Sequence, residues 1–79
     1  MSEEEEIKIV ELINTNSSPL WSLIEKHGRY LTEDEYHVPE DYWLEKAKAK
    51  DAKLIIILNQ DEGESGLIAF DSEGIPVSI

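Results

Sequence analysis

The sequence predicts a small α+β domain in which two or three short helices pack on one face of an antiparallel β-meander. Two observations lead to this class. Apolar runs rich in β-branched residues occupy 54–58, 66–70 and 75–79, and polar turns separate them. Helix start and stop signals alternate between residues 18 and 50. With 79 residues and no long linker, the chain is expected to form one domain, residues 1–79.

The last third of the chain, residues 53–79, contains the predicted meander. Its second connection, Asp71-Ser72-Glu73-Gly74, is typical of a type I turn that a left-handed glycine closes. Pro76 has no N–H to donate to a neighbouring strand, so the final strand is expected at an edge of the sheet.

Capping residues predict the helices in the middle of the chain. Ser18 before Pro19 favours a helix that begins there and ends at Gly28. Thr32 and Glu35 form a capping-box pattern, which predicts a short helical turn that ends before Pro39. A further helix is expected from Pro39 to about residue 50, because its first turn is acidic and its last turn is rich in lysine.

The segment 3–14 has two interpretations. Ser2 and the acids at positions 3–6 would suit the start of a helix. The apolar residues that follow cover too wide a face for one narrow helical stripe, and Ile7 and Ile9 alternate as in a strand. We favour the helix and keep the strand as the alternative.

The charge of the chain limits its partners. Eighteen acidic residues against seven lysines and arginines give a formal charge of −11, which opposes direct contact with nucleic acid or with an anionic membrane. The sequence has no cysteine, no signal-peptide pattern and no apolar run long enough to span a bilayer. We therefore expect a cytoplasmic protein, and the acidity either attracts a basic partner or only maintains solubility.

No motif with recognisable chemistry is present. His27 and His37 lack the spacing of metal ligands or of a catalytic pair. The acidic loop that begins at Asn59 departs from a calcium loop, because Glu64 stands at the glycine position and Phe70 at the bidentate position. We expect no catalytic residue, no metal and no cofactor, and hence a protein that is not an enzyme.

The acidic stretches that alternate with aromatic residues are the candidate binding surface. Carboxylates beside an aromatic anchor could occupy the basic surface of a protein partner. This predicts a non-enzymatic inhibitor, antitoxin or immunity-type protein, including the possibility of a nucleic-acid mimic. An acidic adaptor that binds through an apolar patch or a sheet edge is the alternative. The candidate residues are Glu33, Asp34, Glu35, Tyr36, Glu40, Asp41, Tyr42, Asp61, Glu62 and Glu64.

The segment Leu67-Ile68-Ala69-Phe70-Asp71-Ser72-Glu73-Gly74, in a small acidic chain, resembles the end of the phage uracil-DNA glycosylase inhibitors. The resemblance implies an α+β fold and a DNA mimic that blocks a repair enzyme. It covers eight residues, and the acidic strand of that family has no counterpart in this chain. No functional residue is therefore transferred from it.

Overall fold

The computed structural model describes residues 7–13, 17–60 and 63–79. Predictions for Ser2, for the acids at 3–6 and for Asp61 and Glu62 lie outside the described residues. The elements in chain order are β1 (Lys8–Ile13), α1 (Leu20–His27), β2 (Arg29–Tyr30), the 3₁₀-helix η1 (Glu33–His37), α2 (Glu40–Ala49), β3 (Leu54–Asn59), β4 (Ser65–Phe70) and β5 (Pro76–Val77). The predicted small α+β domain is confirmed, with two α-helices in the described residues.

The strands form one mixed sheet rather than a purely antiparallel one. Its order is β1-β3-β4-β2, and β5 also pairs with β4. The predicted antiparallel pairing is correct for β3, β4 and β5. It is wrong for the sheet as a whole, because β1 runs parallel to β3. A parallel pair requires a long crossover connection, and here the chain between β1 and β3 supplies both helices.

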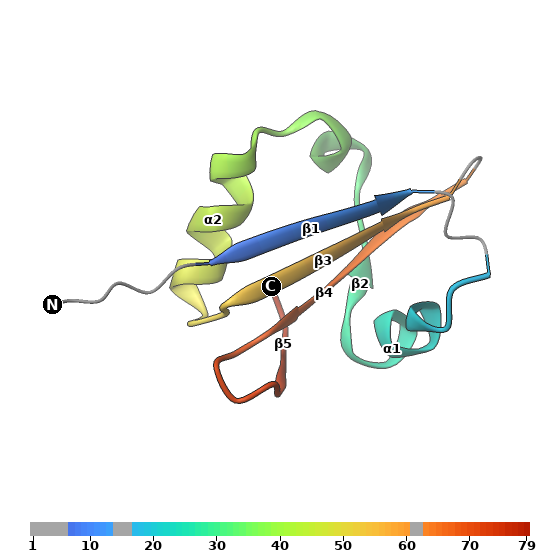
Figure 1. The fold of residues 1–79 in the computed structure, drawn as a ribbon. Helices are drawn as coiled ribbons and strands as arrows, with labels where there is room; N and C mark the ends of the chain where they lie inside the picture. Colours follow the sequence, from blue (N-terminus) through green and yellow to red (C-terminus); the bar gives the residue numbers. More distant parts are fainter. Residues whose placement is uncertain (1–6, 14–16, 61–62) are drawn as a thin grey trace, which may run out of the picture.

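The two helices lie on opposite faces of the sheet (Figure 1), so the prediction that they share one face is wrong. Trp43 and Ala47 of α2 pack with Ile55 and Ile57. On the other face, Ile24 of α1 packs with neighbouring apolar side chains of β3 and β4, Leu58 and Ile68. Successive side chains of a strand point to opposite faces, so an uninterrupted apolar strand such as β3 is buried on both sides.

Residues 8–13 form strand β1, so the preference for a helix in the segment 3–14 is wrong. Ile7 and Ile9 pack against the α2 side of the core, whereas Lys8 and Val10 alternate with them and are exposed. Six residues of β1 pair in register with β3, from Lys8 opposite Leu54 onward. Pairing with the buried strand β3 therefore determines the conformation of residues 8–13. The acidic run at 3–6, which favoured the helix prediction, lies outside the described residues.

The start of α1, the turn between β4 and β5 and the position of Pro76 agree with the predictions from local sequence. Helix α1 begins one residue after Pro19, and the Leu20 N–H donates to Ser18 Oγ (3.2 Å). Gly74 has φ +82° and donates its N–H to the Asp71 carbonyl (3.0 Å), as expected for the predicted turn. Pro76 pairs only with β4, which confirms the expected edge position within the described residues.

Candidate partner-binding groove

A groove of about 390 Å³ lies on the α2 face, where β1, η1 and the start of α2 meet. Its apolar lining comes from the sheet, from α2 and from the connections on either side of η1. Its polar lining includes three carboxylates and one phenol. The lining residues are Ile9, Glu11, Leu31, Glu35, Tyr36, Val38, Glu40, Trp43, Ile57 and Asn59. The groove therefore combines apolar walls with negative charge.

A hydrogen-bonded network around Glu35 holds one side of the groove together. Arg29 donates two hydrogen bonds to this carboxylate, from Nη1 to Oε1 (2.7 Å) and from Nη2 to Oε2 (2.9 Å). The Tyr42 hydroxyl donates to Oε2 (2.7 Å), and the Thr32 N–H of the predicted capping box donates to Oε1 (3.1 Å). Arg29 also lies over the Trp43 ring, 5.9 Å from its centroid. The network ties β2, η1 and α2 to one another.

These contacts shift the ionisation of the groups involved. The hydrogen bonds from Arg29, with further donation from Thr32 and Tyr42, lower the pKa of Glu35 to about 2 although burial opposes the charge. The hydrogen bond to Glu35 raises the pKa of Tyr42, and the same carboxylate raises the pKa of Arg29. Glu35 is thus a buried, ionised anchor of the fold, only 7% exposed, and its charge is already matched by Arg29.

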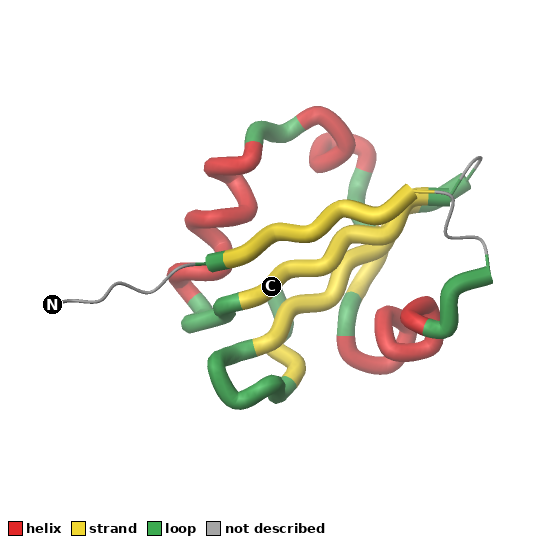
Figure 2. The backbone as a smooth tube through the Cα atoms, viewed as in Figure 1, coloured by secondary structure: helices red, strands yellow, loops and turns green. Residues whose placement is uncertain are grey.

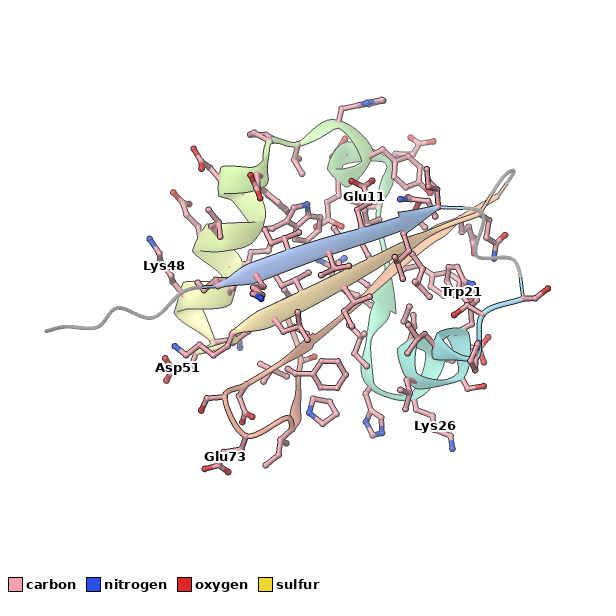
Figure 3. All side chains as sticks on the ribbon, in the orientation of Figure 1. Glu11, Trp21, Lys26, Lys48, Asp51 and Glu73 are labelled. Carbon is pink, nitrogen blue, oxygen red and sulfur yellow. The ribbon has the colours of Figure 1, made fainter. Side chains whose placement is uncertain are left out.

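Glu11 and Glu40 are the two exposed carboxylates of the groove. Glu11 accepts a hydrogen bond from Asn59 Nδ2 (2.9 Å), and Figure 3 shows it pointing from β1 toward the side that η1 occupies. Glu40 stands in the first turn of α2, where a negative charge complements the helix dipole. Within the described residues, Arg29–Glu35 is the one ion pair, so neither exposed carboxylate is neutralised by a lysine or arginine.

The structure brings only some of the predicted binding residues together. Glu35, Tyr36 and Glu40 line the groove, but Glu35 is buried and already paired. The remaining described candidates lie outside the groove lining: Glu33, Asp34, Asp41, Tyr42 and Glu64. Of these, only Tyr42 is half-buried, and it contacts Glu35. Asp61 and Glu62 fall outside the described residues.

Sequence reasoning missed Glu11, Asn59 and the apolar floor. The alternation of Ile7 and Ile9 in the sequence was the one pattern from which the position of Glu11 could have been predicted. Continued by two residues, that alternation places Glu11 on the same face of a strand as Ile9. Asn59 comes from a strand that is distant in sequence, and only the parallel register of β1 and β3 brings it beside Glu11.

Comparisons with protein-family models, with curated proteins and with solved structures find no match to this chain. Among residues 7–13, 17–60 and 63–79, no three acidic, histidine or cysteine side chains are grouped so that they could hold a metal ion. The helices in that part of the chain are too short or too polar to cross a membrane.

Proposed function

We propose that this chain is a non-enzymatic, cytoplasmic binding protein that inhibits or masks a basic protein partner. The observation that carries the proposal is the groove, in which the exposed carboxylates of Glu11 and Glu40 border an apolar floor. Such a floor can hold the aliphatic part of a lysine or arginine while the carboxylates contact its charged end. The formal charge of −11 would accelerate the approach of a basic partner.

The inhibitor, antitoxin, immunity-type and nucleic-acid-mimic roles all belong to this proposal, since each requires carboxylates that occupy a basic surface. The exposed acids of η1 and of the first turn of α2 extend the negative charge beyond the groove: Glu33, Asp34 and Asp41. The absence of cysteine supports the cytoplasmic location, where structural disulfides are rare.

An adaptor that binds through a sheet edge is the second candidate. Three of the large apolar side chains that are exposed in the described residues belong to β1: Val10, Leu12 and Ile13, at 38%, 39% and 72%. Contacts of this kind persist at high salt, whereas contacts between exposed charges weaken.

The test is affinity capture from a lysate of the source organism, followed by elution with a salt gradient. The groove variant carries Glu11→Gln and Glu40→Gln. Its charge-matched control carries Glu45→Gln on α2 and Glu73→Gln in the β4–β5 turn, both exposed and outside the groove. We expect basic proteins to leave the wild type and the control at the same salt concentration, and the groove variant at a lower one.

Equal loss of binding in the two variants would contradict a specific role of the groove, because total charge alone would then explain capture. Proteins that remain bound to all three forms at high salt would favour the adaptor. Circular dichroism spectra that match the wild type establish that each variant is folded.

A further inference from the structure

We propose that the partner binds as an extended segment of alternating cationic and apolar residues, which pairs with the outer edge of β1 as an additional strand. This inference rests on the proposed function and specifies how the basic partner is held. It joins two neighbouring features of the fold: the outer edge of β1, with which no other described strand pairs, and the acidic groove beside it.

The outer edge of β1 has backbone groups available for pairing. β1 is the terminal strand of the sheet in the described residues, and Figure 2 shows it along one border of the yellow strands. Lys8 donates its N–H to the Lys53 carbonyl (2.9 Å), so every second residue from Lys8 pairs with β3. The N–H and C=O groups of Ile9, Glu11 and Ile13 consequently point outward.

Apart from the charged residues Lys8 and Glu11, this edge lacks the features that usually protect a sheet from adding another strand. Natural edges are often blocked by proline, by bulges or by several charged side chains. Pro76 occupies the β5 edge, whereas residues 8–13 contain no proline and pair with β3 at six successive positions without a bulge. The exposed apolar side chains of Val10 and Leu12 follow this edge on the face away from the groove.

The residues of β1 on the two faces of the sheet determine which side chains suit the added strand. On the α2 face, a neighbouring side chain would lie beside Glu11 and reach the groove that Glu40 and Tyr36 line. A lysine or arginine fits this position by charge and by its aliphatic stem. On the opposite face, the next side chain would lie beside Val10 and Leu12, where an apolar residue reduces exposed apolar area.

Charge complementarity favours a basic segment over a second copy of this chain. Each copy carries a formal charge of −11, so pairing two β1 strands would bring two strongly acidic molecules together. A symmetric antiparallel pair centred on Glu11 would also place two like charges directly opposite each other. A cationic extended segment avoids both of these charge repulsions.

The test uses the full chain labelled with ¹⁵N and an acetylated, amidated eight-residue peptide of alternating lysine and valine. The control peptide has the same side chains but is N-methylated at every residue, which removes the backbone N–H donors from both of its edges. We expect the first peptide to shift the amide signals of Ile9, Glu11 and Ile13 and to slow their hydrogen exchange. The control peptide should bind about tenfold more weakly, since it loses several backbone hydrogen bonds.

Two variants separate the contributions of the edge and of the charge. Ile13→Pro removes an outward N–H at a position that is 72% exposed, and it should weaken binding of the unmethylated peptide severalfold. Glu11→Gln should weaken it at low salt, whereas Glu45→Gln should not.

The outcomes distinguish the strand pairing from the proposed function. Equal binding of the two peptides, with unchanged β1 amides, would overturn strand addition and leave a charge-based masking role intact. Protection of the β1 amides that appears on raising the protein concentration alone would identify a second copy as the occupant and overturn the inference. Failure of both peptides to bind at low salt would contradict the basic partner and the strand addition together.

Discussion

Replacing Glu35 by glutamine should destabilise the fold at neutral pH and have little effect near pH 2. The substitution removes the charge that Arg29 contacts at 2.7 and 2.9 Å while it conserves the shape of the side chain. Lowering the pKa of Glu35 from 4.5 to about 2 corresponds to about 3 kcal/mol. Because a third of the Arg29 side chain is exposed to water, we expect a loss of about 2 kcal/mol in the free energy of unfolding.

The sign of the pH dependence follows from the direction of the shift. The folded state holds Glu35 ionised more strongly than the unfolded chain does, so its stabilisation is complete above the unfolded pKa of 4.5. It decreases as the pH falls from there and is lost below about 2, where both states are protonated. The difference between wild type and Glu35→Gln should therefore be largest at pH 7 and should shrink through this interval.

Urea unfolding at pH 7, 4 and 2.5 measures this difference, and the combined fluorescence of the buried Trp43 and the half-buried Trp21 reports the transition. Glu33→Gln is the matched control, since it removes an exposed charge from the same 3₁₀-helix. A Glu35→Gln variant as stable as this control at pH 7 would refute the reasoning. So would a difference that stays constant down to pH 2.5, because it would then arise from packing and not from charge.

Three further substitutions, one of them a control, test the packing and the turn. Ile24→Ala removes a fully buried side chain on the α1 face and should cost about 2–4 kcal/mol in urea unfolding, whereas Leu23→Ala on the same helix, 39% exposed, should cost under about 1 kcal/mol. Similar losses in the two variants would contradict the packing of α1. Gly74→Ala adds a β-carbon to a residue whose backbone has φ +82°, and it should lower the free energy of unfolding by about 1 kcal/mol. A thermal midpoint equal to that of the wild type would contradict this turn conformation.

Local chemistry in the sequence was enough to predict most element boundaries. Ser18 before Pro19, the Thr32–Glu35 capping box and the Asp71–Gly74 turn each act within a few residues, so the sequence contains the whole interaction. The capping box also located Glu35. Its pairing with Arg29 could not be predicted, because β2 must first place that arginine beside η1.

The arrangement of the layers depended on contacts that local patterns do not encode. The run Leu54–Leu58 did contain a usable signal, since a strand that is apolar at every position requires cover on both faces. Applied consistently, that rule would have placed α1 and α2 on opposite sides of the sheet.

The pattern of apolar residues also distinguishes β1, the strand that both functional proposals involve, from β3. β3 is apolar on both faces and lies inside the sheet, whereas in β1 only Ile9 is half-buried and β1 is the terminal strand among the described residues. Its face toward α2 contributes Ile9 and Glu11 to the groove, and no other described strand pairs with its outer edge. A partner that pairs with this edge would gain hydrogen bonds, apolar contact and charge complementarity from one short strand. A partner held by charge alone would have no requirement for β1, so the backbone N-methylation test distinguishes these two forms of recognition.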